Sequence, residues 1–173
     1  MPVTAVSLDN PRLLDASALY DLVCRSKPLD ENSRYLYMLM CSHFRESCVV
    51  ARAGEGSDDE RLAGAVTAYR LPEMPGTLFV WQVAGDPGFR GQGLAGRMVE
   101  HLVKRAAEPV RFLEATVTPS NMASMKLFRG LAERWKAGIE ESTVFPAGLF
   151  GAGTHEEERL LRIGPLQSET KGA

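Results

Sequence analysis

The sequence predicts a mixed α/β domain, in which a central, mostly antiparallel sheet is flanked by helices. Three strand-like segments at 47–53, 62–69 and 77–83 are joined by short loops, which is typical of an antiparallel meander. Helical patterns come before and after these strands, so the class is mixed rather than all-β. The chain has 173 residues and is 45% apolar, which is enough for a substantial core. We therefore expect a single domain over residues 1–166 and a disordered tail over 167–173.

The composition argues against several classes of function. The formal net charge is −2, so the basic surface of a nucleic-acid-binding protein is not expected. No apolar run is long enough to span a membrane. The cysteines Cys24, Cys41 and Cys48 lack CxxC spacing, and no signal peptide is recognisable, so we expect free thiols in a reducing, cytoplasmic compartment. His43 has no partner at metal-ligand spacing, and we expect no metal site.

Two helices are expected in the N-terminal third of the chain. The first begins after Asn10 and is ended by Pro28. Asp15 or Ser17 could cap its start. The second, at 34–44, carries large side chains nearly all round, so we expect it to be largely buried or to face a pocket. The buried face of the first helix is expected at Leu14, Ala18, Leu22, Leu19 and Val23.

An acidic turn precedes the second helix and admits two interpretations. Asp30 and Glu31 could bind an ammonium group. Tyr35 or Tyr37 could donate hydrogen bonds to the same substrate. Alternatively, Asp30 caps the helix and the tyrosines belong to the core, because acidic residues commonly stabilise helix starts. The sequence pattern alone favours this second interpretation.

The stretch FVWQVAGDPGFRGQGLAGR, at 79–97, predicts an anion-binding turn between a strand and an amphipathic helix. A helix start leaves backbone N–H groups unpaired and carries partial positive charge. Gly91 and Gly93 would let a phosphate approach the backbone closely. Arg90 and Arg97 could add full charges, so the turn suits a diphosphate. An ordinary glycine-rich connection would show the same pattern.

Neighbouring features narrow the type of site. The chain has no G-x-x-x-x-G-K-[ST] motif, and GQGLAG lacks the downstream acidic residue of a dinucleotide-binding unit. Trp81 and Gln82 lie beside the end of the strand, where a large aromatic side chain such as Trp81 could form a pocket wall. Core packing is the alternative, and it would leave the indole N–H in need of a partner.

A second strand-to-helix junction follows. Residues 111–117 are predicted to form a strand, and 122–131 a helix that Ser120 or Asn121 could cap. The buried stripe of this helix is expected at Ala123, Leu127 and Leu131, with Phe128 adjacent.

The C-terminal part is expected to add two strands. Trp135 and Ile139 indicate one strand within 133–143. The segment 145–153 is rich in Pro, Gly and Phe and is expected to be a loop. The last strand is expected within 155–163.

The two junctions together resemble the GCN5-related N-acetyltransferases. RGQGLA at 90–95 matches the [QR]-x-x-G-x-[GA] motif, which in that family binds the pyrophosphate of acetyl-CoA. NMASMKLF at 121–128 resembles the N-x-x-[AS]-x-x-[LF]-[YF] element that follows the fifth strand, where the Asn commonly contacts the pantetheine arm. The resemblance implies that fold, with acetyl-CoA as co-substrate. The cofactor-binding residues that it implies are Val83, Gly85, Arg90, Gly91, Gln92, Gly93, Leu94, Ala95, Gly96, Arg97, Asn121 and Phe128.

One position departs from the family pattern. Many members carry a Tyr at the last position of the second element, where it is proposed to protonate the departing CoA thiolate. Phe128 stands there in this chain and has no proton to give. Water, the backbone or another side chain would have to do this, unless little protonation is needed.

Further blocks are similar to the diaminobutyrate acetyltransferases of ectoine biosynthesis. That family acetylates the 4-amino group of L-2,4-diaminobutyrate, giving N4-acetyl-L-2,4-diaminobutyrate. The similarity runs from about residue 10 to residue 166. The blocks are LDENSRYLY at 29–37, HF at 43–44, FVWQV at 79–83, TVTPSNMAS at 116–124, HEEE at 155–158 and RIGP at 162–165.

The resemblance implies a pocket for a small zwitterion with a second ammonium group, which needs carboxylates, a cation and aromatic walls. The substrate-binding residues would be Asp30, Tyr35, Tyr37, Trp81, His155 and Glu158. The catalytic residues would be Asp30, Trp81, Glu114, Asn121 and Glu158. Exposed strand edges in the tail indicate a homodimer.

The expected chemistry is direct attack of the neutral amine on the thioester, without an acetyl-enzyme. The ammonium must first lose a proton, and a backbone N–H near Val83 would polarise the carbonyl. The base could be any of Glu114, Asp30, Glu158 and His155, which the sequence does not rank. Two alternatives remain: an acetyltransferase for another small amine or amino acid, and a non-catalytic acyl-CoA sensor.

Overall fold

The computed structural model describes residues 5–54, 56–57, 60–153 and 155–167. Seven strands in this part form one sheet, in the order β1-β2-β3-β4-β5-β7-β6. The strands are β1 (Val6–Asp9), β2 (Val49–Ala53), β3 (Arg61–Leu71), β4 (Met74–Gly85), β5 (Phe112–Val117), β6 (Ile139–Phe145) and β7 (Glu158–Ile163). The helices are α1 (Ala16–Arg25), α2 (Arg34–Ser42), α3 (Leu94–Arg105) and α4 (Met122–Trp135), with short 3-10 turns η1 (Leu13–Asp15), η2 (Arg45–Ser47), η3 (Pro87–Phe89) and η4 (Ala147–Phe150).

The sheet is mixed and mostly antiparallel, as the sequence predicts. β1 with β2, β2 with β3, β5 with β7 and β6 with β7 pair in antiparallel fashion. β4 and β5 pair in parallel, with Thr77 opposite Phe112 and Val80 opposite Ala115. A parallel pair needs a crossover connection, which α3 supplies between these two strands. In the described part of the chain, no helix is both long and apolar enough to cross a membrane.

The chain divides into two compact units. The described residues of the first lie within Met1–Tyr69 and Trp81–Ala107, and those of the second within Arg70–Val80 and Glu108–Ala173. The single domain over 1–166 stays a prediction. Of the tail predicted to be disordered, residues 168–173 lie outside the described part.

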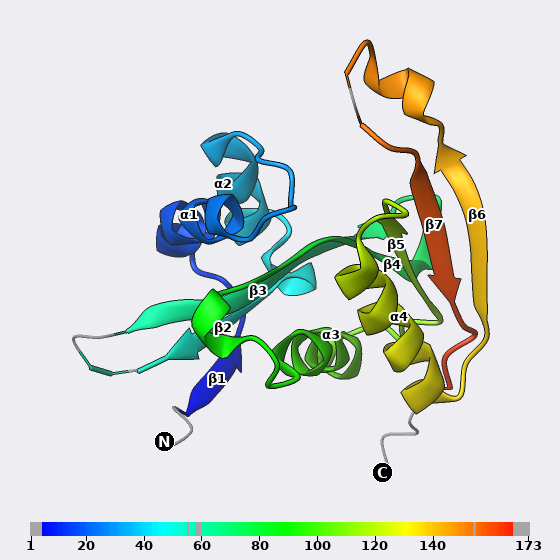
Figure 1. Cartoon of the computed structure of the whole chain (residues 1–173). Coiled ribbons are helices and arrows are strands. Elements are labelled where there is room, and N and C mark those ends of the chain that lie inside the picture. Colours follow the sequence, from blue (N-terminus) through cyan, green and yellow to red (C-terminus); the bar gives the residue numbers. More distant parts are fainter. Residues whose placement is uncertain (1–4, 55, 58–59, 154, 168–173) are drawn as a thin grey trace. The chain divides into compact units, whose positions relative to one another are not determined.

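The first unit has a layer of helices on each face of its strands (Figure 1). α1 and α2 share an apolar core with one face, in which Leu22 and Tyr37 contact the cluster that includes Val50 of β2. α3 packs on the other face, where a Cβ added to Gly64 would lie 2.9 Å from the end of the Met98 side chain. Successive strand residues point to opposite faces, so both faces of β2 and β3 are buried.

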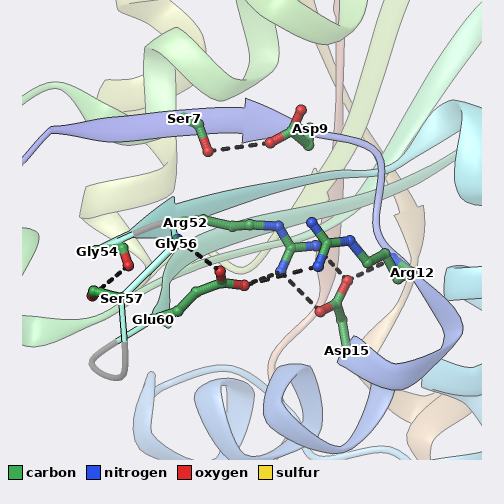
Figure 2. A network of polar contacts seen from close by, with 9 residues as sticks. All are labelled: Ser7, Asp9, Arg12, Asp15, Arg52, Gly54, Gly56, Ser57 and Glu60. Atoms are coloured by element: carbon green, nitrogen blue, oxygen red, sulfur yellow. Dashed lines mark hydrogen bonds and ion pairs between the residues drawn. The ribbon is translucent and has the colours of Figure 1, made fainter.

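A buried ion pair ties β2 to the start of the first helix. The guanidinium of Arg52 donates to both carboxylate oxygens of Asp15, at 2.9 and 2.6 Å, and approaches Glu60 at 3.5 Å (Figure 2). The backbone N–H of Arg12 also donates to Asp15. Burial by itself would raise the pKa of Asp15, but the bonds from Arg52 and Arg12 outweigh it, and the pKa lies below its ordinary value.

Several predictions for the N-terminal third are wrong in detail. β1 precedes the first element that the sequence predicted. Leu14 is 91% exposed and Ala18 is exposed, because η1 interrupts the helical spacing and α1 begins only at Ala16. The actual buried face is Ala16, Leu19, Leu22 and Val23. Asp15 holds the capping position of α1 but makes no side-chain capping bond there, because it pairs with Arg52.

α2 also differs from the prediction. It ends at Ser42 rather than Phe44, and Ser33 caps it by accepting from the N–H of Leu36. Asp30 therefore is not its cap. The helix is amphipathic rather than buried all round, since Tyr35 is 67% exposed while Tyr37, Met40 and Cys41 are buried.

The second unit contains the end of β3, the first part of β4, the strands β5, β7 and β6, and the helix α4. β7 lies between β5 and β6, and Arg162 of β7 stands opposite Glu114 on one side and Glu140 on the other. α4 is capped by Asn121, whose side-chain oxygen accepts from the N–H of Ser124 at 3.1 Å. Its buried side chains are Met125, Phe128, Leu131 and Ala132.

Here too the element boundaries shift. Ala123 is exposed and Leu127 is only partly buried, so the predicted stripe of α4 holds only at Leu131. Trp135 belongs to α4 and not to a strand, because the helix continues until Lys136 adopts a left-handed conformation. β7 begins at Glu158, not at His155.

Candidate active site

The predicted diphosphate turn forms the link between β4 and α3 in the first unit. Asp86 leaves the sheet with its N–H donating to the carbonyl of Ala63, and its carboxylate accepts from the N–H of Gly88 at 2.9 Å. Phe89 then turns inward and is buried. These anchors fix the turn just before its glycines.

Two glycines give the turn its shape. Gly91 has φ +75° and Gly93 has φ +68°, and a Cβ added at either would meet nothing within 4 Å. Residues other than glycine rarely adopt this left-handed backbone conformation. The turn therefore exposes bare backbone at both positions, with open space in front of it.

The first turn of α3 is built to receive negative charge. Gly93 is the N-cap residue and has no side chain to accept from the helix N–H groups, and no acidic residue lies in the first turn. Unpaired N–H groups and the helix dipole favour an anion at such an end. Arg90 and Arg97 flank it and are exposed, and Gln92 is exposed beside them.

The other cofactor-binding residues predicted in this unit lie within the start of α3 and at the end of β4, and they are buried or partly buried. Leu94 and Gly96 are buried in the packing of α3, and Ala95 is partly buried. Val83 and Gly85, at the end of β4, are partly buried, and a Cβ on Gly85 would meet nothing within 4 Å.

The acidic turn predicted to receive an amine lies in the same unit. Asp30 and Glu31 are in the exposed loop between α1 and α2, and Lys27 pairs with Glu31 at 2.6 Å. The carbonyl of Asp30 accepts from the side-chain amide of Gln82 at 2.8 Å. Tyr35 is exposed, whereas Tyr37 is fully buried and its hydroxyl donates to Gln82.

Trp81 belongs to a row of aromatic rings. Its indole meets Tyr69 edge-on, with ring centroids 6.4 Å apart, and Tyr69 in turn meets Phe44 at 6.2 Å. Burial raises the pKa of the Tyr69 phenol. Trp81 is 41% exposed, so it combines the two predicted roles: one part packs and the other forms surface.

Glu114, in the second unit, is held by an ion pair. Glu114 is 5% exposed, and its carboxylate accepts from the guanidinium of Arg162, which stands opposite it across β5 and β7. The same guanidinium lies 3.9 Å from the ring centroid of Phe112. Glu114 is thus buried and committed to Arg162.

The helix start at Asn121 places two polar groups beside each other. Asn121 uses its side-chain oxygen as the helix cap, and its amide N–H₂ takes no part in that bond. Ser120 donates instead to the carboxylate of Glu156. Phe128 points into the packed face of α4 and is buried.

His155 and Glu158 come together before and at the start of β7. The imidazole Nε2 lies 3.9 Å from a carboxylate oxygen of Glu158, and the ring stacks on Phe150 with centroids 3.9 Å apart. Glu157 pairs separately with Arg159 at 2.9 Å. The three glutamates of HEEE thus have three different partners, in Ser120, Arg159 and His155.

The predicted site residues divide between the two units. The diphosphate turn, Asp30 and Trp81 belong to the first, and Glu114, Asn121 and Glu158 to the second. Gln82 and Arg162 are not among the predicted catalytic or binding residues, because the residues to which they bond lie far away in the sequence. Among the described residues, no group of three or more His, Cys, Asp or Glu side chains is placed to hold a metal.

Comparison with known proteins identifies the family. The model of the acetyltransferase (GNAT) family matches residues 16–132. L-2,4-diaminobutyric acid acetyltransferase of Streptomyces avermitilis is 45% identical over 92% of this chain and 88% of its own length. The enzyme of the same name from Halalkalibacterium halodurans is 43% identical over 94% of this chain and 84% of its own.

A solved structure agrees with these relatives. Diaminobutyrate acetyltransferase from Paenibacillus lautus, in complex with L-2,4-diaminobutyric acid and coenzyme A, has a TM-score of 0.87 and 39% identity, covering 94% of this chain and 96% of its own. The fold that the sequence predicted is thereby confirmed. The chain belongs to the GNAT acetyltransferase family and, within it, to the diaminobutyrate acetyltransferases.

Proposed function

We propose that this protein transfers the acetyl group of acetyl-CoA to the 4-amino group of L-2,4-diaminobutyrate, giving N4-acetyl-L-2,4-diaminobutyrate for ectoine synthesis. One observation carries the proposal: the chain is similar, over nearly all its length, to the Paenibacillus lautus enzyme in complex with that amino acid and coenzyme A. The open N-terminus of α3 supports the coenzyme half of this assignment.

The diphosphate of acetyl-CoA is assigned to the turn before α3. Backbone N–H groups at Gly91 to Gly96 would bind its oxygens, and Arg90 and Arg97 would neutralise its charge. The amide of Asn121 would meet the pantetheine arm, as the family motif implies. Phe128 would contribute apolar contact.

The amine is assigned to carboxylates and aromatic side chains. In the first unit, Asp30 would bind an ammonium group, and Tyr35 and Trp81 are the candidate aromatic side chains. In the second unit, Glu158 is the candidate carboxylate, and His155 lies beside it. Tyr37 would not bind the amine directly, because it is buried and its hydroxyl donates to Gln82. It would instead support the site through Gln82. Of the candidate bases, we favour Glu158 with His155, or Asp30, over Glu114, because Glu114 is buried and its carboxylate already pairs with Arg162.

The proposed chemistry is direct transfer. The lone pair of the neutral 4-amino nitrogen attacks the thioester carbon, the C–S bond breaks, and the CoA thiolate leaves. The proton of the amine passes to the base. A backbone N–H near Val83 would stabilise the oxyanion. A thiolate is a fair leaving group near neutral pH, since thiols ionise at a pKa of about 8.5, which lessens the need for a tyrosine at Phe128.

Initial rates with a panel of amines test this function. CoA release from acetyl-CoA would be followed with L-2,4-diaminobutyrate, ornithine, lysine and spermidine. We expect the highest kcat/KM for diaminobutyrate. A preference for another amine would assign this protein to another substrate, and acetyl-CoA binding without turnover of any amine would favour the acyl-CoA sensor.

A homodimer and a cytoplasmic location stay predictions. β6 lies at the end of the strand order and is exposed along most of its length, which supports pairing with a second copy. Light scattering of the purified protein would give its oligomeric state.

A further inference from the structure

The loop between α1 and α2, residues 26–33, carries Asp30 and lacks regular secondary structure. Most of its residues are exposed, although Leu29 packs against the apolar core and its N–H donates to the carbonyl of Ser26. A carboxylate that binds substrate from such a loop needs an anchor, because small displacements of a binding group weaken binding and orientation.

Gln82 anchors this loop to β4. Its side chain is 7% exposed, and its amide nitrogen donates to the carbonyl of Asp30 at 2.8 Å. Its amide oxygen accepts from the hydroxyl of Tyr37 at 3.0 Å. A carbonyl can only accept, so the nitrogen of Gln82 must face Asp30 and the oxygen must face Tyr37.

Tyr37 holds the amide from the side of α2. It is fully buried in the core of the first unit and meets Tyr20 edge-on at 6.0 Å. Burial raises the pKa of its phenol, and hydrogen bonds with Asn32 and Gln82 oppose part of that rise. Tyr37 thus reaches the loop at Asn32 while Gln82 holds it at Asp30.

The position of Gln82 on β4 links this anchor to the proposed site. Alternate strand residues point to opposite faces, so Gln82 points inward while Trp81 and Val83, on either side, point the other way. The burial agrees, since Gln82 is buried and Trp81 is not. One short stretch of β4 therefore carries both the aromatic wall and the support of the loop.

We infer that Gln82 is a positioning residue that holds Asp30 at a fixed place relative to the end of β4. It thereby sets the length of the diamino acid that the site accepts. The inference rests on the proposed function. Diaminobutyrate and ornithine differ by one methylene, and a pocket selects between such homologues only if its ends stay at a fixed separation.

Three variants and a control test this role. Gln82→Met keeps the side-chain volume and removes both hydrogen bonds, and Gln82→Glu removes the donor to Asp30 but leaves an acceptor for Tyr37. Tyr37→Phe removes the bond that orients the amide, together with the bond to Asn32, and keeps the ring. Val50→Ala is the control, because Val50 belongs to the same core cluster and contributes no polar atom. The measurements are KM and kcat for each substrate, and hydrogen exchange of the loop.

In Gln82→Met we expect the KM for diaminobutyrate to rise about fivefold to tenfold, the size of one lost buried hydrogen bond. The preference for diaminobutyrate over ornithine should fall, the loop should exchange faster, and the KM for acetyl-CoA should stay within about twofold of wild type. Tyr37→Phe should show the same changes, but smaller. Val50→Ala should be less stable than wild type, with its KM values and its substrate preference unchanged.

The possible outcomes distinguish a failure of the positioning role from a failure of the proposed acetyltransferase function. If wild type prefers diaminobutyrate while the Gln82 and Tyr37 variants keep its KM and selectivity, the positioning role is wrong and the function stands. If wild type turns over no amine, both are wrong. Should Gln82→Met and Gln82→Glu fail to fold, Tyr37→Phe still decides, because it preserves the ring packing.

Discussion

At the scale of single residues, Asp15 and Arg52 show how much one buried pair contributes. The guanidinium makes two hydrogen bonds to the carboxylate, and both groups lie inside the first unit. Removing one member of a buried pair leaves the other charge without compensation. Asp21 and Arg34 pair at 3.0 Å on the surface, with both side chains half exposed, and offer a comparison.

Asp15→Asn should lower the free energy of unfolding by about 3 kcal/mol, whereas Asp21→Asn should lower it by less than about 1 kcal/mol. The folded-state pKa of Asp15 is depressed, so its contribution is present above the unfolded pKa of about 3.9 and is lost as pH falls through the folded value. The gap between wild type and Asp15→Asn should therefore close below about pH 4. Urea unfolding at several pH values measures the free energy of unfolding of each variant and its dependence on pH. Equal losses of this free energy in Asp15→Asn and Asp21→Asn would contradict the importance of the buried pair.

The cysteines support direct transfer at the same scale. Burial raises the pKa of Cys41 to about 12 and that of Cys48 to about 11. Thiols of such pKa carry almost no thiolate at neutral pH and make poor nucleophiles. Cys24 is only partly buried.

The triple variant Cys24→Ser, Cys41→Ser and Cys48→Ser should retain turnover, with part of its stability lost from the two buried positions. Activity and circular dichroism are measured on the same sample. A folded variant without any turnover would speak for an acetyl-enzyme and against direct attack.

At the scale of elements, the link between β4 and α3 joins backbone shape to binding. Gly93 needs a left-handed backbone and presents open space to the proposed diphosphate. Gly56, in the β2–β3 loop, has a similar φ of +77° and also meets nothing within 4 Å. It lies outside the proposed site, so the two glycines share their backbone requirement but not their function.

Gly93→Ala and Gly56→Ala should each lower stability by roughly 1–2 kcal/mol, the cost of a left-handed L-residue. Only Gly93→Ala should also weaken acetyl-CoA binding, by at least about tenfold, because its Cβ would stand where a phosphate approaches. Calorimetric titration gives the Kd. An unchanged Kd in Gly93→Ala would place the diphosphate elsewhere.

Local signals explain which elements the sequence could predict. The strand, turn and helix at 79–97 are marked by neighbouring glycines and by helical spacing, and they were predicted correctly. The burial of α1 was not, because η1 changes the spacing before the helix begins. Trp135 was misassigned since the residue that stops α4, Lys136, carries no glycine or proline signal.

At the scale of the whole molecule, several buried side chains bond with residues far away in the sequence. Gln82 bonds with partners 45 and 52 positions away, and Glu114 with one 48 positions away. Periodicity and turn chemistry reveal no such pairs. The resemblance of several blocks to one family predicted the substrate, and the comparisons agree with it, but the roles of individual side chains stay predictions.

We predict acetylation at one particular nitrogen of a substrate that has two amines. The product formed from acetyl-CoA and L-2,4-diaminobutyrate would be isolated and its acetylated nitrogen assigned by NMR. We expect N4-acetyl-L-2,4-diaminobutyrate, with the 2-amino group unmodified. Acetylation at the 2-amino group, or no acetylated product from a protein that binds acetyl-CoA, would contradict the proposed function.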